Sequence, residues 1–186
     1  MRLFAALHPP AAVLDALAGA VEDARGSHPA LHLTARRTWH LTLAFYGETD
    51  EPAAKALPGL LADAVAASRP PRLHLSGAGA FPTRTPGRAK VLWTGVEGDL
   101  AALADLAERC AEAGTRAGLD SPERSRPFHP HLTLARTRTP RDLRAPAALL
   151  AAFTSPEWTP KALDLMLSHY PSPGHTLLRS LPFESP

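Results

Sequence analysis

The five-residue sequence His-Leu-Thr-Leu-Ala occurs twice, at residues 40–44 and 131–135, so the copies stand 91 residues apart in a chain of 186. In a β-strand, residues i and i+2 point to one face and the residue between them points to the other. Each copy therefore predicts a strand with a histidine and a threonine on one face and two leucines facing a core. The spacing predicts two pseudo-equivalent lobes around one shared site, formed by His40, Thr42, His131 and Thr133.

Two facing histidines can act as acid and base in one reaction, because the unperturbed pKa of imidazole lies near neutral pH. A hydroxyl two residues along can donate a hydrogen bond to a phosphate oxygen, and this arrangement needs no metal. The alternative is that both are ordinary half-buried strand histidines. Similar tripeptides occur elsewhere in the chain, at residues 32–34 and 74–76, so the tripeptide alone is weak evidence.

The longer context of each copy is more specific. The first copy lies in Trp-His-Leu-Thr-Leu-Ala-Phe-Tyr-Gly-Glu (residues 39–48), and the second lies in Arg-Pro-Phe-His-Pro-His-Leu-Thr-Leu-Ala-Arg (residues 126–136). With the segments at 1–7, 77–82 and 91–93, these stretches resemble the 2H phosphoesterase superfamily. Within it they are similar to the RNA 2′,3′-cyclic phosphodiesterases, historically called 2′-5′ RNA ligases.

The resemblance implies a role for each motif residue. His40 is expected to protonate the departing ribose 3′-oxygen and His131 to activate water, which leaves a 2′-phosphate. Thr42 and Thr133 are expected to donate hydrogen bonds to the non-bridging phosphate oxygens. Arg136 matches an arginine thought to help hold the nucleotide. Strict alternation puts Arg136 on the face opposite His131, so this role requires the strand to end or twist there.

The resemblance also implies an α+β fold with two pseudo-symmetric lobes, each an antiparallel sheet with flanking helices, around a central active-site cleft. We expect residues 1–186 to form a single domain of two intertwined lobes. The expected partners are RNA or nucleotides with 2′,3′-cyclic phosphate ends, and the chain is expected to act as a monomer without metal, cofactor or membrane.

Two other functions stay open. The site could act on another cyclic phosphate or a 2′-5′ linkage, including the joining of RNA ends, although the chain lacks the Gly-x-x-x-x-Gly-Lys-Ser/Thr sequence of nucleotide-driven enzymes. Alternatively, the chain could be an RNA-end or nucleotide binding module without turnover. A binder needs no acid and base pair, so the two histidines favour an enzyme.

Composition adds modest constraints. The net charge is only +2, but 17 of the 20 basic residues are arginine, which suits phosphate and base contacts or reflects a GC-rich coding sequence. The single cysteine, Cys110, cannot form an internal disulfide and is expected to pack on a helix face. His129 and His131 have poor metal-ligand geometry without a nearby carboxylate. Pro9, Pro10 and Asp15 interrupt the apolar N-terminus, which argues against export and predicts a cytoplasmic location.

The aromatic residues beside the motifs have two possible positions. Tyr46 and Phe128 are candidates for contact with a base, with core packing as the alternative. Phe45 is two residues beyond Leu43, so alternation places it on the same face as the leucines and predicts a core position.

Hydrophobic periodicity and turn residues predict the order of elements. A polar, proline-bearing loop is expected at 120–127, leading into the second motif strand, and a closing hairpin is expected to turn at residues 171–174. The expected strands are 2–8, 39–46, 72–79, 89–96, the second motif strand, 160–169 and 175–181, and the expected helices are 11–24, 51–67, 99–117 and 141–152.

Overall fold

The computed structural model describes residues 1–28, 31–119, 127–172 and 174–184 and contains one seven-stranded antiparallel sheet. The chain passes through β1 (Arg2–Leu7), α1 (Ala11–Ser27), η1 (Arg36–Thr38), β2 (Leu41–Glu48), α2 (Glu51–Ala66), β3 (Leu73–Phe81), η2 (Pro86–Arg88), β4 (Ala89–Gly98), α3 (Leu100–Arg116), β5 (His131–Arg141), α4 (Arg144–Leu149), β6 (Ala162–Ser168) and β7 (His175–Pro182). The expected α+β class is confirmed.

The sheet has two halves joined at its middle. Its strand order is β3-β4-β5-β2-β1-β6-β7. The first half consists of β2, β1, β6 and β7, and the second half consists of β5, β4 and β3. A single registered pair, Leu41 with Leu132, joins β2 to β5, whereas the other neighbouring strands pair over five to eight positions. The two lobes are therefore parts of one sheet, which has the fewest paired residues between the two motif strands.

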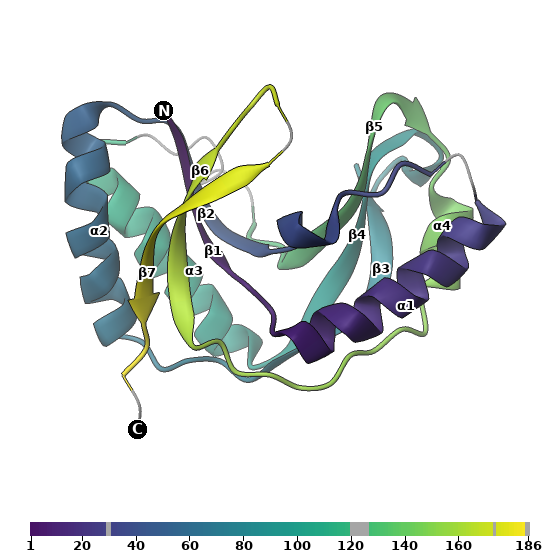
Figure 1. Ribbon diagram of the computed structural model, residues 1–186, viewed down its shortest axis with the longest axis horizontal. Helices are drawn as coiled ribbons and strands as arrows, with labels where there is room; N and C mark the ends of the chain where they lie inside the picture. The colour runs from purple at the N-terminus through teal and green to yellow at the C-terminus, as the bar shows by residue number, and fades with distance from the viewer. Residues whose placement is uncertain (29–30, 120–126, 173, 185–186) are drawn as a thin grey trace.

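The helices are exchanged between the halves (Figure 1). Helix α1 follows β1 of the first half but lies beside α4 over the second half. Helix α3 follows β4 of the second half but packs against α2 and β2 of the first. The chain therefore crosses the junction more than once, and each half is completed by a helix that follows a strand of the other.

The leucines of both motif copies enter the core as alternation predicts. Leu41, Leu132 and Leu134 are completely buried, and Leu43 is nearly so. Cys110 is also completely buried on α3, as expected for a residue on an apolar helix face. Burial of each leucine side chain contributes about 1.5–3 kcal/mol, so both motif strands are held firmly by their inward faces.

Local signals placed most element boundaries correctly. Asp50 and Asp99 cap α2 and α3, each accepting a hydrogen bond from the backbone three residues on. The hairpin of β6 and β7 is present. The largest differences, of three residues, are at the end of α1, which continues past Gly26 to Ser27, and at both ends of α4. Helix α4 begins later than expected because β5 extends to Arg141. Residues 120–126 of the expected loop lie outside the described residues.

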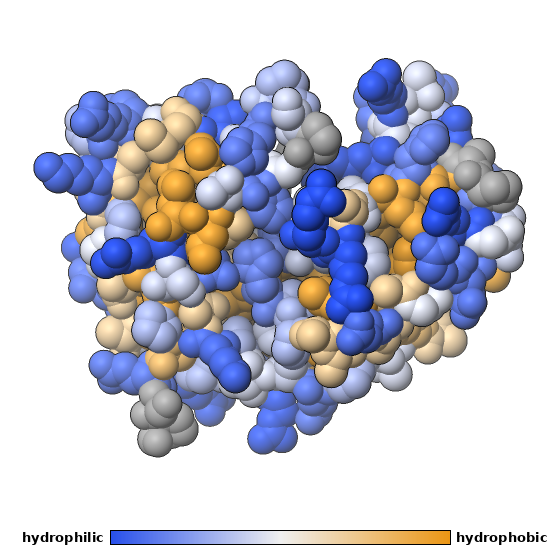
Figure 2. All heavy atoms as spheres, viewed as in Figure 1, coloured by the Kyte–Doolittle hydropathy of each residue, from blue (hydrophilic) through white to orange (hydrophobic). Residues whose placement is uncertain are grey.

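Over the described residues, none of the helices has the length and apolar character that a bilayer span requires. On the face in Figure 2, hydrophobic side chains gather in one area over each half of the molecule, and mainly hydrophilic residues separate these areas.

Candidate functional site

The four motif side chains meet where the two halves of the sheet join. Leu41 and Leu132 form the registered pair between β2 and β5. In antiparallel pairing, one step along one strand matches one step back along the other. His40 and Thr133 therefore flank this pair on one side, and Thr42 and His131 flank it on the other. All four are half-buried, on the face opposite the leucines.

Both histidines are held in the same way by the backbone. His40 Nδ1 lies 2.7 Å from the Thr38 carbonyl oxygen, and His131 Nδ1 lies 2.7 Å from the His129 carbonyl oxygen. A carbonyl only accepts, so Nδ1 carries the proton in both rings. In the neutral imidazole Nε2 then has a free lone pair, which at His40 accepts from the Thr42 hydroxyl at 3.1 Å. The reactive nitrogen of each histidine is therefore Nε2.

A bulge follows the threonine in each motif strand. In the second copy Leu92 pairs with Ala135 and Trp93 pairs with Thr133, which leaves Leu134 as an extra residue. In the first copy Ala5 pairs with Ala44 and Ala6 with Thr42. One extra residue reverses the alternation beyond it.

Because of the bulges, Arg136 and Phe45 lie on the opposite face of the sheet from the one that strict alternation predicts. Arg136 pairs with Val91 and lies on the face of Thr133 and His131, so the bulge supplies the irregularity that its expected role required. Its first-copy counterpart is Phe45. The core position predicted for Phe45 was wrong, because it is half-buried and packs against Phe4 and Met166 on the same face as Thr42.

A segment before the first motif secures the second bulge. The Thr34 hydroxyl donates to the carbonyl oxygens of Thr133 and Leu134, both at 3.0 Å. Trp39 Nε1 in turn donates to that hydroxyl at 3.0 Å. Thr34 belongs to the tripeptide at residues 32–34, which resembles the start of the repeated motif. Its hydroxyl contacts backbone carbonyls of β5.

The surroundings lower the pKa of both histidines. At His40, burial is the main cause and the neighbouring His175 adds to it, so the pKa falls from 6.5 to about 3. At His131, burial again is the main cause, and the nearby His129 and Arg136 charges also lower the pKa. The Arg136 charge contributes to the lowered pKa of both histidines. Both imidazoles are therefore neutral at pH 7 in the unliganded protein.

Aromatic rings support each histidine. Phe4 stacks on His40 with the ring centres 4.9 Å apart, and Phe81 meets His131 edge-on at 4.9 Å. Trp93 packs against Phe81 at 5.2 Å and crosses Gly79 so closely that a Cβ there would overlap its indole. Phe81 and Trp93 thus form an aromatic surface beside His131.

The other predicted aromatic candidates lie in different environments. Tyr46 is buried and its hydroxyl donates to the Cys110 carbonyl at 3.0 Å, so it is a core residue. Phe128 is 38% exposed, three residues before His131.

Two histidines without a predicted role, His8 and His175, adjoin His40. His175 meets the His40 ring edge-on at 4.8 Å, and His8 lies 5.9 Å from it between ring centres. His175 is the first residue of β7 and His8 directly follows β1, and both are far from either motif copy in the sequence. These three residues have the spacing of metal ligands.

In the described part of the chain, an open pocket of about 370 Å³ lies between β3 and α4, and neither motif histidine lines it. Its lining is mainly small and apolar, with Trp93, Leu143 and Arg144 among the larger residues. It offers no acid and base pair.

Solved structures share this fold across nearly the whole chain. TT0787 of Thermus thermophilus is 28% identical, with a TM-score of 0.76 and 98% of each chain covered. Escherichia coli LigT complexed with 3′-AMP is 26% identical, with a TM-score of 0.70 and coverage of 99% of this chain and 98% of that one.

Curated relatives carry one name. An RNA 2′,3′-cyclic phosphodiesterase of Aeropyrum pernix is 40% identical over 112 residues, which are 60% of each protein. A protein of the same name from Geobacillus stearothermophilus is 34% identical over 141 residues, which are 73% of this chain and 43% of that protein. The matches thus span less than two thirds of these relatives' lengths.

A sequence model of the 2′-5′ RNA ligase superfamily matches residues 13–169, which include both motif copies and most of the sheet. The resemblance noted in the sequence is confirmed: the chain belongs to the 2′-5′ RNA ligase superfamily of 2H phosphoesterases.

Proposed function

We propose that this protein is an enzyme that hydrolyses RNA 2′,3′-cyclic phosphate ends to 2′-phosphomonoesters, with no metal in the reaction. The observation that carries this proposal is the placement of His40, Thr42, His131 and Thr133 around the single β2–β5 pair, on one face of the sheet. Membership of the superfamily and the name shared by the curated relatives support the substrate class.

The reaction needs one proton removed and one delivered. In the proposed step, His131 Nε2 accepts a proton from water as the water oxygen bonds to phosphorus. The bond from phosphorus to the ribose 3′-oxygen breaks, and protonated His40 delivers a proton to that oxygen from Nε2. The product keeps its phosphate on the 2′-oxygen. The ring strain and fixed leaving group of the substrate leave positioning and proton transfer as the main tasks.

Three other side chains are proposed to stabilise the phosphate. The hydroxyls of Thr42 and Thr133 would donate to its non-bridging oxygens, and the Arg136 guanidinium would offset its negative charge. The bulge in β5 supports the role of Arg136, because it returns this residue to the face of His131.

The acid role of His40 depends on substrate binding. Burial is the main cause that holds the pKa of free His40 at about 3, so at neutral pH, before substrate binds, Nε2 of this residue carries no proton and the ring is neutral. A bound phosphate anion favours the charged imidazolium and raises that pKa. The proposed acid therefore gains its proton when the anion arrives.

RNA is the proposed source of the cyclic phosphate. Single-stranded RNA ends are recognised by stacking of unpaired bases on aromatic rings. Phe81 and Trp93 form such a surface beside His131. Their position supports a nucleotide bound with its base over the second half of the sheet and its phosphate at the junction.

Hydrolysis of an oligonucleotide that ends in a 2′,3′-cyclic phosphate, with EDTA present, tests the proposal. Wild-type protein should yield a 2′-phosphate, and His40→Ala and His131→Ala should each lose about 10²–10⁴-fold in rate. His74→Ala is the matched control, since His74 is a half-buried strand histidine that pairs with Glu97 away from the junction.

Three results would contradict the proposal. Folded wild-type protein that binds the oligonucleotide without converting it is a binding module. Joining of ends without hydrolysis would assign the site to RNA ligation. Undiminished product release by either histidine variant would remove the acid and base pair from the mechanism.

A further inference from the structure

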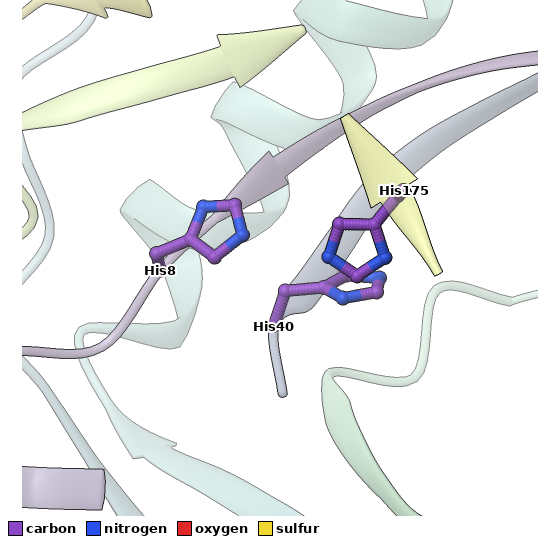
Figure 3. A group of neighbouring side chains, drawn as sticks. All are labelled: His8, His40 and His175. Carbon is purple, nitrogen blue, oxygen red and sulfur yellow. The ribbon is translucent and has the colours of Figure 1, made fainter. Parts of the chain in front are cut away.

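Three histidines from three distant parts of the chain converge (Figure 3), and the rings of His40 and His175 contact Phe4. His8 directly follows β1, His40 directly precedes β2, and His175 is the first residue of β7. One ring nitrogen of each lies within 4.8 Å of the corresponding nitrogens of the other two, and all three side chains are half-buried. The fold thus brings together three imidazoles that are 32 and 135 residues apart along the chain.

Hydrogen bonds orient two of these rings. His8 Nδ1 donates to Asp164 Oδ2 at 2.8 Å, and the Ser180 hydroxyl donates to the other oxygen of that carboxylate at 2.6 Å. His40 Nδ1 is held by the Thr38 carbonyl. In His8 and His40, Nε2 is therefore the nitrogen that could bind a metal ion. A carboxylate or carbonyl behind a histidine is the usual support of a metal-binding imidazole, because it fixes the tautomer and raises the basicity of the other nitrogen.

The donor set selects the kind of ion. Three imidazoles without a carboxylate ligand suit Zn²⁺ and similar transition metals, whereas Mg²⁺ and Ca²⁺ require oxygen ligands. We propose that His8, His40 and His175 bind one Zn²⁺ ion, with its fourth position open, and that this ion inhibits the enzyme by occupying His40 Nε2. The inhibition rests on the proposed function, and the binding does not.

The site must contract to bind the ion. Zinc-to-nitrogen bonds of about 2.0–2.1 Å in a tetrahedron place the nitrogens about 3.4 Å apart, so the widest pair must close by up to about 1.4 Å. His8 and His175 lie at strand ends, where side-chain rotation can supply this movement. At His40 the ion would displace the hydrogen bond from Thr42, which is 3.1 Å long.

Binding is tested without any reaction by titrating the metal-free protein with Co²⁺, whose visible absorption reports tetrahedral coordination, and then displacing it with Zn²⁺. We expect one equivalent of Co²⁺ to bind. His8→Ala and His175→Ala should weaken binding at least about 10-fold, and Asp164→Asn should weaken it about 10–100-fold through loss of the support behind His8. His32→Ala is the control, since His32 is exposed and outside the cluster.

Inhibition is tested on hydrolysis of the cyclic phosphate. Zn²⁺ should inhibit wild-type protein and EDTA should restore the rate, whereas the rates of His8→Ala and His175→Ala, each compared with the same variant's own rate in EDTA, should resist Zn²⁺. Absence of a stoichiometric Co²⁺ signal, or equal Co²⁺ affinity in the two variants and wild type, would overturn the site. Inhibition lost in His129→Ala but kept in His8→Ala would place the ion elsewhere. A wild type without hydrolytic activity would refute the proposed function while the Co²⁺ titration still decides the metal site.

Discussion

The two copies of the motif lie in half-sites with similar backbones and different surroundings. The first half-site consists of Phe4, His40, Thr42 and Phe45, and the second consists of Phe81, His131, Thr133 and Arg136. In both, the histidine donates from Nδ1 to the carbonyl two residues before it, an aromatic ring packs on the imidazole, and a bulge follows the threonine. The repeated sequence thus produces a repeated local geometry.

The half-sites differ in burial and charge. His40 is packed against two further histidines, and its pKa falls to about 3. His131 is beside His129 and the aromatic surface of Phe81 and Trp93. At the position after each Ala, the first half-site has Phe45 and the second has Arg136. Residues outside the repeat therefore give two histidines with the same local geometry different electrostatic surroundings.

The largest effect is expected with a substrate whose leaving group departs without a proton from an acid. This substrate tests whether the two histidines have different roles. If the 3′-bridging oxygen of the cyclic phosphate is replaced by sulfur, the departing thiolate is stable without a proton. We expect this substrate to restore most of the roughly 10²–10⁴-fold loss in His40→Ala but not in His131→Ala. Single-turnover rates of both variants on the oxygen and sulfur substrates provide the measurement. Rescue of His131→Ala instead would exchange the two roles.

A second test compares the residues that differ between the half-sites. Arg136→Met should lower kcat/KM about 10–100-fold, because a hydrogen bond to a charged group contributes about 1.5–3 kcal/mol. Phe45→Leu, at the corresponding position, should change kcat/KM less than about threefold. Equal effects of the two substitutions would show that Arg136 has no special part in holding the phosphate.

The pH dependence of kcat/KM tests the electrostatic difference in the free enzyme. The productive form has one histidine protonated and the other neutral, and the pKa of both is lowered below 6.5. The optimum should therefore lie below pH 6.5, with kcat/KM falling about tenfold per pH unit above neutrality. Rates measured between about pH 4 and pH 9 with EDTA present supply the profile. A plateau centred above pH 7 would be incompatible with these lowered pKa values.

The smallest effect is expected on the shape of the unfolding curve. We propose that residues 1–186 form one folding unit, because α1 and α3 are exchanged between the two halves of the sheet. Urea unfolding followed by tryptophan fluorescence and by far-ultraviolet circular dichroism should give coincident, single transitions. Two separated transitions would indicate that the halves are independent lobes.

Local sequence was sufficient for many features of this protein. Alternation in the repeated pentapeptide predicted two strands with buried leucines, and Asp50 and Asp99 marked the starts of two helices. The longer motif context identified the family. These features depend on residues a few positions apart, whose preferences act within one strand or one helical turn.

Tertiary structure decided what alternation could not. The faces of Phe45 and Arg136 depend on bulges that are defined only by pairing with β1 and β4. The meeting of His8 and His175 with His40 depends on the closing hairpin beside β1, more than 150 residues from the start of the chain. Sequence by itself determined the two motif strands and the family, whereas strand pairing and burial determined the environment of each histidine, because both arise from contacts between residues that are distant along the chain.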